Sequence, residues 1–210
     1  MTSKAGPPQS SVLPEPPLGL RERKKRRTRE AIRREAYRLF REQGYDATTV
    51  DQIADAAEVS PSTFFRYFPT KEDVVLTDEY DPAIMQALRA VAPGTPIVET
   101  VRQAVLGPLR AMMDDGRAEM EIRMRLAVAE PAVQARSYHQ QRETMRMMAE
   151  VFAERSGRDP DDPQPRYAAA TVVGVLNESM LLWAENGFVR DPVEVVDEAL
   201  RFLASGLHTM

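Results

Sequence analysis

Residues 49–71 read TVDQIADAAEVSPSTFFRYFPTK and predict two short helices joined by a tight turn. Thr49 stands just before apolar residues that recur at helical spacing, and Gln52 follows it three positions later. This is the pattern of a capping box, in which each of the two side chains accepts a hydrogen bond from the backbone of the other residue. The turn at residues 58–60 should end this first helix.

The second helix of the stretch has its own start signal and its own buried side. Ser60 is suited to cap it, and Pro61 fits the first helical position, where the missing N–H leaves no hydrogen bond unmade. Phe64 and Phe68 are one turn apart, so they share a face and should anchor the helix. Two helices in this order are typical of a helix-turn-helix, whose second helix enters the DNA major groove.

The wider stretch 25–75 resembles the DNA-binding signature of the TetR family of transcriptional repressors. The matching features are Leu39-Phe40, Gly44-Tyr45, Thr48-Thr49, Ile53-Ala54, Val59-Ser60, Thr63-Phe64-Phe65, Tyr67-Phe68 and Lys71. The phenylalanine-rich sequence FFRYF resembles a subset common in actinobacteria, including regulators of the mycofactocin type. The resemblance implies an all-α fold of about nine helices, and no segment shows the alternation of a β-strand. It also implies ligand-responsive control of transcription, with repression as the expected sense.

The candidate DNA contacts lie on or beside the exposed face of the second helix, at two caps and at one lysine. They are Thr49, Ser60, Ser62, Thr63, Phe65, Arg66, Tyr67 and Lys71. The resemblance implies phosphate contacts for Tyr67 and Lys71. Thr49 and Ser60 have a second interpretation as helix caps alone, although a capped N-terminus can also present its N–H groups to a phosphate. Arg66 has the chemistry to reach a guanine edge.

Two positions depart from the family pattern. Glu58 stands where the family usually has Gly in the turn. If that position needs a positive φ, a side chain there costs about 1 kcal/mol. Phe65 replaces the usual Tyr and lacks the hydroxyl that would bond a phosphate, although its ring is suited to contact a thymine methyl.

The charge of the chain is divided unevenly. Residues 21–71 hold 13 Lys and Arg against 8 Asp and Glu, whereas residues 72–210 hold 14 Arg against 23 acidic residues. A basic first part and an acidic remainder indicate that only the first part meets a polyanion. Within it, RERKKRRTR at 21–29 is interpreted as an arm that follows phosphates or enters the minor groove, with Arg26 and Arg27 as contacts. The alternative is a solvated charge run.

These patterns divide the chain into a disordered tail at 1–20, the basic arm and helix-turn-helix at 21–70, and a larger helical domain at 71–210. We expect the first helix at about 28–43, followed by the two helices above. A box from Thr70 to Asp73 should start the next helix. The remaining helices are expected at about 83–91, 96–116 with a kink at Pro108, 119–129, 131–155, 166–186 and 192–207.

Several function classes find no support in the composition. The chain has no Cys, no export signal and no apolar run near the roughly 20 residues of a membrane span, which favours a reducing cytoplasm. Its two histidines, His139 and His208, have no partner at metal-ligand spacing, and no phosphate-cradling glycine loop or nucleophile motif occurs. We therefore expect no metal, no cofactor and no enzymatic activity.

The larger domain is expected to hold an effector, because flexible Met side chains on several helices suit an adaptable pocket. The candidate ligand residues are Met112, Met120, Arg123, Met124, Met145, Met148, Phe152, Asn177 and Trp183. The alternative for each apolar residue is ordinary core. The acidic excess of this domain favours a small, mainly apolar effector, aromatic or a lipophilic cation. An acyl thioester held by Arg123 or Arg125 is the competing interpretation.

We also expect a homodimer on palindromic double-stranded DNA, because two-fold operators need two-fold proteins. The interface is predicted in the last two helices, at Ala170, Gly174, Leu181, Val196, Leu200 and Leu203. A second hypothesis is a DNA-binding protein without an effector, which acts architecturally or through a protein partner. A cavity in the larger domain would favour the first hypothesis, and a solid core would favour the second.

Overall fold

The computed structural model describes residues 19–76, 81–159 and 161–206, and its regular structure is helical throughout these ranges. The expected all-α fold is therefore confirmed. The helices are α1 Leu20–Gln43, α2 Val50–Ala56, α3 Pro61–Tyr67, α4 Lys71–Leu76, α5 Asp81–Ala90, α6 Ile97–Ala129, α7 Pro131–Ser156, α8 Pro163–Glu185 and α9 Pro192–Ala204. The tail expected at 1–20 lies almost wholly outside the described residues.

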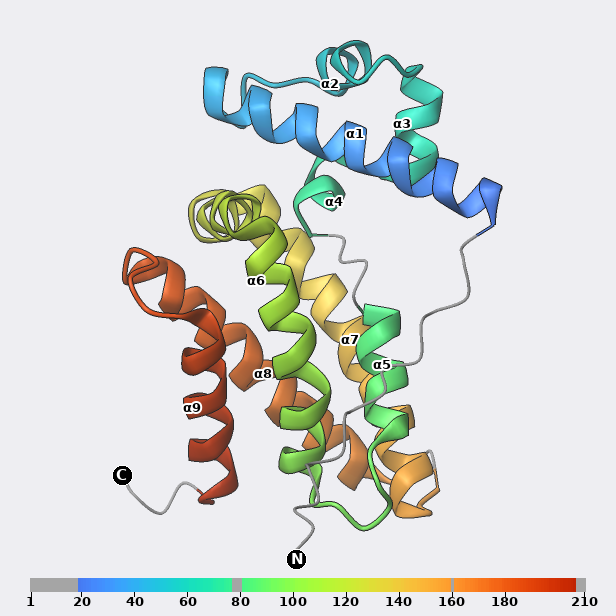
Figure 1. Cartoon of the computed structure of the whole chain (residues 1–210), viewed down its shortest axis with the longest axis vertical. Coiled ribbons are helices and arrows are strands. Elements are labelled where there is room, and N and C mark those ends of the chain that lie inside the picture. Colours follow the sequence, from blue (N-terminus) through green and yellow to red (C-terminus); the bar gives the residue numbers. More distant parts are fainter. Residues whose placement is uncertain (1–18, 77–80, 160, 207–210) are drawn as a thin grey trace, which may run out of the picture.

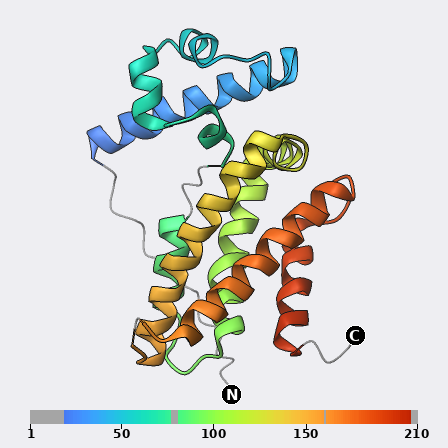
Figure 2. The ribbon, with the colours of Figure 1, turned by 180° about the vertical axis from the view of Figure 1, so that it is seen from behind.

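The helices form two groups joined by α4 (Figure 1). Helices α1, α2 and α3 lie together at one end, and α5 to α9 form a longer bundle at the other, with α5 and α9 on opposite sides of it (Figure 2). Each group has its own hydrophobic core. The core of the small group continues into α7 through Val133, so the two groups pack directly on one another.

The helix-turn-helix forms for the local reasons that the sequence indicates. The Gln52 backbone N–H donates to the Thr49 hydroxyl oxygen at 3.2 Å, and the Thr49 N–H donates to the Gln52 side-chain carbonyl at 2.9 Å. This capping box starts α2.

Helix α3 has its own cap, because Ser60 accepts a hydrogen bond from the Thr63 N–H at 3.1 Å. Phe68 follows α3 and is fully buried, which confirms it as an anchor of this helix.

Helix α1 is longer than expected. It begins at Leu20, so the basic run at 21–29 is helical and is not a separate arm. Arg and Lys are good helix formers, and no Pro or Gly interrupts the chain between Leu20 and Gln43. An Arg26–Glu30 pair at 3.4 Å across one turn supports the same conformation.

Helix α6 spans both of the helices expected at 96–116 and 119–129. Gly116 separates them, because its φ of −150° and ψ of 29° are not helical. Pro108 lies inside α6 as expected and keeps helical backbone angles, and Gly116 is the one position within α6 whose angles are not helical. The α6 half after Gly116 therefore has its own direction.

Helix α8 begins at Pro163, three residues before the expected start, because Asp162 caps it by accepting from the Gln164 N–H at 2.9 Å.

The length and mean hydropathy of α8 are those of a membrane span, contrary to the expectation that no apolar run has the length of a membrane span. A core helix of a soluble protein has the same properties. Helix α8 packs on α6, α7 and α9, and Trp183 and Val172 are buried there.

Candidate DNA-binding surface and effector cavity

The candidate DNA contacts of α3 lie on its outer side. Ser62, Phe65 and Arg66 are exposed, and the Phe65 side chain is 51% exposed although it is large and apolar. Thr63 is half-buried and takes a hydrogen bond from the Ser60 hydroxyl at 2.9 Å. The Arg66 guanidinium lies 5.3 Å from the centre of the Tyr67 ring. Helix α3 therefore presents one polar and aromatic surface to the outside.

Lys71 has a structural role that its sequence context did not reveal. Its ammonium donates to the backbone carbonyls of Tyr45 at 2.8 Å and Thr48 at 3.1 Å. It also lies 4.0 Å from the centre of the Tyr45 ring. Lys71 thus bonds the start of α4 to the loop before α2. Thr49, at the end of that loop, is exposed. An ammonium has three protons, and two of the three are used here.

The basic stretch of α1 divides between solvent and protein. Arg26 and Arg27 are exposed, as a phosphate contact requires. Arg29 and Arg33 turn instead toward Phe68, with guanidinium carbons 5.3 Å and 5.9 Å from its ring centre. Sequence reasoning missed these contacts, because they join residues more than thirty positions apart. They hold α1 against the end of α3.

The turn between α2 and α3 is strained at Glu58. Its φ is 54°, the left-handed region that glycine adopts readily, so the condition under which a side chain is costly there is met. The Val59 N–H donates to the Ala54 carbonyl at 2.9 Å and the Glu58 N–H to the Asp55 carbonyl at 3.1 Å. These two bonds form a Schellman motif, which requires this conformation. A side chain at this position is therefore retained at a cost in stability.

We expect Glu58→Gly to raise the free energy of unfolding by about 1 kcal/mol, because it relieves the left-handed strain. Thermal or urea unfolding of the full chain measures the change. Glu58→Ala is the matched control, since it removes the same charge but keeps the β-carbon. Equal stabilisation by both variants would attribute the effect to charge and contradict the strain argument.

A cavity of about 520 Å³ lies within the larger group of helices. Its wall draws residues from each of α4 to α9 and is mainly apolar. The candidate ligand residues on this wall are Met112, Met120, Arg123, Met124, Met148 and Asn177. Its volume lies in the range of small-molecule sites. The structure thus brings most of the candidate ligand residues to one place.

Three other candidates do not line the cavity. Met145 and Phe152 pack in the main core, where Phe152 is 1% exposed. Trp183 is buried, donates its indole N–H to the Arg190 carbonyl at 2.9 Å and packs edge-to-face on Phe188. Phe152 and Trp183 are core, the alternative stated for them above, and the half-buried Met145 packs against the core. Trp183 still packs in one cluster with Met120, so it lies one layer behind the wall.

Sequence reasoning missed the polar residues that α7 contributes to the wall. Gln134, Ser137, Gln141 and Thr144 line the cavity, together with Gln140. The first four recur at intervals of three and four residues, so they occupy one helical face. That polar stripe was the available signal, but polar stripes usually face solvent. His139, on the same helix, is exposed, and His208 lies outside the described residues.

The dimer candidates divide between the surface and the interior of one protomer. Ala170 and Gly174 of α8 are exposed, as an interface requires. Val196 is 1% exposed and Leu200 is 0% exposed, so both are core and the prediction that they contact a second chain is wrong. The strong apolar stripe of α9 faces α6 and α8. Of the remaining two candidates, Leu181 lines the cavity and Leu203 packs on the same core.

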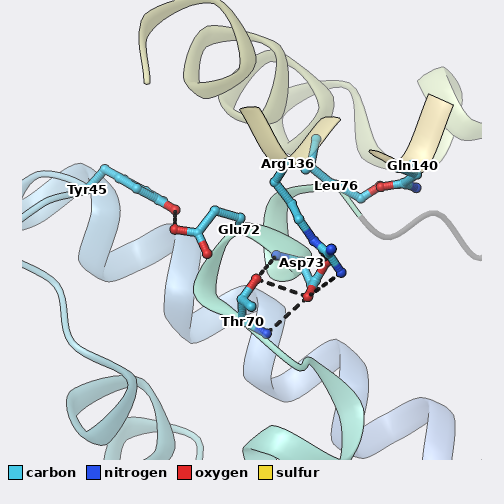
Figure 3. A network of polar contacts seen from close by, with 7 residues as sticks. All are labelled: Tyr45, Thr70, Glu72, Asp73, Leu76, Arg136 and Gln140. Atoms are coloured by element: carbon cyan, nitrogen blue, oxygen red, sulfur yellow. Dashed lines mark hydrogen bonds and ion pairs between the residues drawn. The ribbon is translucent and has the colours of Figure 1, made fainter. Parts of the chain in front are cut away.

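Helix α4 is fastened by a polar network between the two groups of helices (Figure 3). Asp73 accepts from the Thr70 N–H at 3.0 Å, and the Asp73 N–H donates to the Thr70 hydroxyl at 3.2 Å, which confirms the expected box. The Arg136 guanidinium of α7 reaches the same carboxylate at 2.9 Å and 3.3 Å. This bond raises the pKa of Arg136. Asp73 is 6% exposed, so the pair ties α4 to α7 with little competition from water.

Two further contacts join α4 to its neighbours. The Tyr45 hydroxyl donates to the Glu72 carboxylate at 2.8 Å. Burial opposes ionisation of Glu72, but hydrogen bonds from its own backbone and from Tyr45 outweigh burial and lower its pKa. The Leu76 carbonyl, at the other end of α4, accepts from Arg123 at 2.8 Å and from Gln140 at 2.9 Å. Helix α4 is thus bonded to the small group at its start and to the cavity wall at its end.

Among the residues that the structure describes, no cluster of three or more His, Cys, Asp or Glu side chains could hold a metal ion.

Comparison with known families gives two matches. Residues 32–77 match the bacterial regulatory proteins of the tetR family, and residues 95–208 match the MftR C-terminal domain.

Individual proteins agree with these matches. The HTH-type transcriptional regulator TcmR of Streptomyces glaucescens is 40% identical over 179 residues, which cover 80% of this chain and 77% of TcmR. Thermus thermophilus FadR, a TetR-family repressor solved with lauroyl-CoA, has a TM-score of 0.52 and 28% identity over 87% of this chain and 96% of its own. Bacillus subtilis FadR, solved with stearoyl-CoA, has a TM-score of 0.59 at 19% identity and covers 85% of this chain and 99% of its own.

The helix-turn-helix geometry, the two family matches and the similarity to TcmR along most of both chains lead to one conclusion. The chain belongs to the TetR family of DNA-binding transcriptional regulators, which are not enzymes, and its larger domain is of the MftR type.

Proposed function

We propose that this protein is a homodimeric repressor that leaves its operator when a small, mainly apolar effector enters the cavity. The observation that carries the proposal is the position of the cavity, whose wall includes Leu76 of α4. Helix α4 is also the segment that follows the helix-turn-helix in the chain. A ligand that prefers one position of α4 therefore shifts the balance between DNA-competent and released arrangements.

The cavity favours this function over an effector-free DNA-binding protein. A solid core in the larger domain would have favoured the effector-free hypothesis, and about 520 Å³ of mainly apolar space is found instead. Proteins of similar fold were solved with ligands that have a large apolar part, FadR with acyl-CoA and SmeT with triclosan. The wall has one cationic and one anionic side chain among the described residues, Arg123 and Glu185. These two charges balance, but the wall also has amide donors such as Gln140 and Asn177, which suit an acyl or other acceptor-bearing ligand more than a lipophilic cation.

In the proposed complex, two copies of α3 enter successive major grooves. Thr49, Ser60, Ser62, Thr63, Phe65, Arg66, Tyr67 and Lys71 form the contact surface, and Arg26 and Arg27 add phosphate contacts. Base contacts come from the middle of α3, around Thr63 and Arg66, and the remaining residues position the helix. DNA binding of this kind places the protein in the cytoplasm.

The dimer surface that we propose is the exposed stripe of α8. Tyr167, Ala170, Gly174 and Leu182 recur at helical spacing along it, and all four are exposed. Tyr167 is 68% exposed and Leu182 is 44% exposed, so a second chain would cover apolar area that is otherwise in water. Phe202 of α9, 40% exposed, extends the same kind of surface.

A salt titration tests the DNA-binding mode. If six to ten phosphates are contacted, the logarithm of the binding constant should fall with log salt at a slope of about −5 to −9. The probe is a duplex selected by the protein from a random-sequence library. A slope near zero would contradict groove binding by basic side chains.

Two variants separate positioning from base reading in the same assay. Lys71→Ala should weaken binding to all sequences alike, because Lys71 orients the loop before α2 and has one proton left for a phosphate. Thr63→Ala should change base preference at one position of the site. Identical effects of the two variants across a site library would contradict the assignment.

A further inference from the structure

The Leu76 carbonyl is the point where the cavity and α4 share hydrogen bonds. Leu76 is the last residue of α4, and the final carbonyls of a helix have no partner within it. This carbonyl instead accepts from Arg123 at 2.8 Å and from Gln140 at 2.9 Å. Both donors belong to the cavity wall, Arg123 from α6 and Gln140 from α7. Ligand-accessible donors therefore hold the end of α4.

The start of α4 is held equally firmly by the small group of helices. Lys71 bonds the carbonyls of Tyr45 and Thr48, and Glu72 bonds the Tyr45 hydroxyl. With six residues, α4 is about 9 Å long, so its two held ends are less than two helical turns apart. A change in what holds its end is transmitted to the loop that precedes α2.

We propose that the effector carries a hydrogen-bond acceptor, a carbonyl or a carboxylate, which takes the Arg123 and Gln140 donors from the Leu76 carbonyl and thereby releases the end of α4, while the Asp73–Arg136 pair still holds its start to α7. This inference rests on the proposed function and defines which ligands act. Filling the apolar part of the cavity gives affinity, and the exchange of acceptors gives release. A carboxylate is a stronger acceptor than a backbone carbonyl toward a guanidinium, so the exchange favours the ligand.

The same geometry distinguishes active from inactive ligands. A head group with no acceptor, such as a quaternary ammonium, cannot compete for either donor. Such a ligand would occupy the apolar space and leave the two bonds to Leu76 intact. It should bind without releasing DNA and should reduce the effect of an acceptor-bearing ligand by competition.

The first test uses three probes with one ten-carbon body: decanoate, methyl decanoate and decyltrimethylammonium, each below its micelle-forming concentration. Occupancy is followed by Trp183 emission, because Trp183 packs with Met120 of the wall. DNA release is followed with the selected duplex. We expect decanoate to weaken DNA binding about tenfold or more at saturation and decyltrimethylammonium to leave it unchanged. Methyl decanoate should release DNA less than decanoate does, because an ester carbonyl is a weaker acceptor than a carboxylate.

The outcomes distinguish the acceptor rule from the broader proposal that an effector in the cavity releases DNA. If decyltrimethylammonium releases DNA as well as decanoate does at equal occupancy, the acceptor rule is wrong and the effector function stands. If the three probes bind but none releases DNA, both the acceptor rule and the ligand-operated switch are wrong. If none of them binds, the apolar effector site itself is wrong for ligands of this kind.

The second test needs no ligand. The double variant Arg123→Met with Gln140→Leu removes both donors, so the ligand-free protein should bind the duplex about tenfold more weakly. Decanoate should then cause no further loss. Gln140→Leu alone removes one donor and no charge, so it should give an intermediate affinity and remains informative if the double variant is unstable.

Arg110→Met is the matched control for the loss of an arginine from α6. Arg110 is exposed and does not line the cavity. It should keep the affinity of the unsubstituted protein and its response to decanoate. Wild-type affinity and a full response in the double variant, with helical content and unfolding transition unchanged, would overturn the role of the Leu76 bonds.

Discussion

Gly174→Asp should convert the protein into a monomer and weaken operator binding by about 100-fold or more. A monomer places only one α3 on the DNA, so it contacts only one half of a two-fold operator at a time. Gly174 is exposed in the middle of the α8 stripe. A β-carbon built at this position meets no atom within 4 Å in the protomer. The substitution therefore leaves the protomer intact and places two like charges in the proposed interface.

Sedimentation at micromolar concentration and a DNA titration measure the two parts of this expectation. Gln86→Asp is the control, because Gln86 is an exposed residue of α5, on the opposite side of the bundle from α9 (Figure 1). It adds the same negative charge and should leave both the dimer and the DNA affinity unchanged. A Gly174→Asp protein that still sediments as a dimer would place the interface on another surface.

Phe64→Ala should destabilise the small group of helices by about 3–5 kcal/mol and abolish DNA binding. Phe64 is fully buried between α1, α2 and the end of α3, in one cluster with Ile53 and Phe68. Removal of its ring leaves a cavity at the centre of a small core. Few domains of this size have more than this free energy in reserve.

Phe65→Ala is the matched control, one position along the same helix. Its side chain is 51% exposed, so its removal should change stability by less than about 0.5 kcal/mol. DNA affinity should still fall, because the ring belongs to the proposed contact surface. Urea unfolding followed by circular dichroism, combined with DNA titration, separates the two effects. Similar losses of stability in the two variants would contradict the burial pattern of α3.

The sequence by itself determined the helix-turn-helix and its detailed form. The capping box at Thr49, the cap at Ser60 and the two buried aromatic residues in and just after α3 all follow from residues within about one helical turn of each other. The positive φ of Glu58 was suggested by the family resemblance instead, because the family usually has Gly at this position of the turn. Local interactions of this kind require no knowledge of the rest of the fold.

The effector region was predictable only in part. Met112, Met124 and Met148 were expected on one wall, and they are. The same reasoning placed Trp183 there, although its indole N–H is committed to the Arg190 carbonyl and its ring to Phe188. Apolar residues of a buried helix look alike in sequence, because burial in a core and burial around a cavity impose the same composition.

Only the tertiary structure decided how α4 is held. The bonds of Lys71 to Tyr45, of Arg136 to Asp73 and of Arg123 to Leu76 join residues 26 to 63 positions apart. Two of these bonds end on backbone carbonyls, which carry no sequence signal, so no pattern in the chain could have revealed them. The sequence therefore determined the helix-turn-helix. Long-range packing decided which hydrogen-bond donors, such as Arg123, connect α4 and the helix-turn-helix to the cavity.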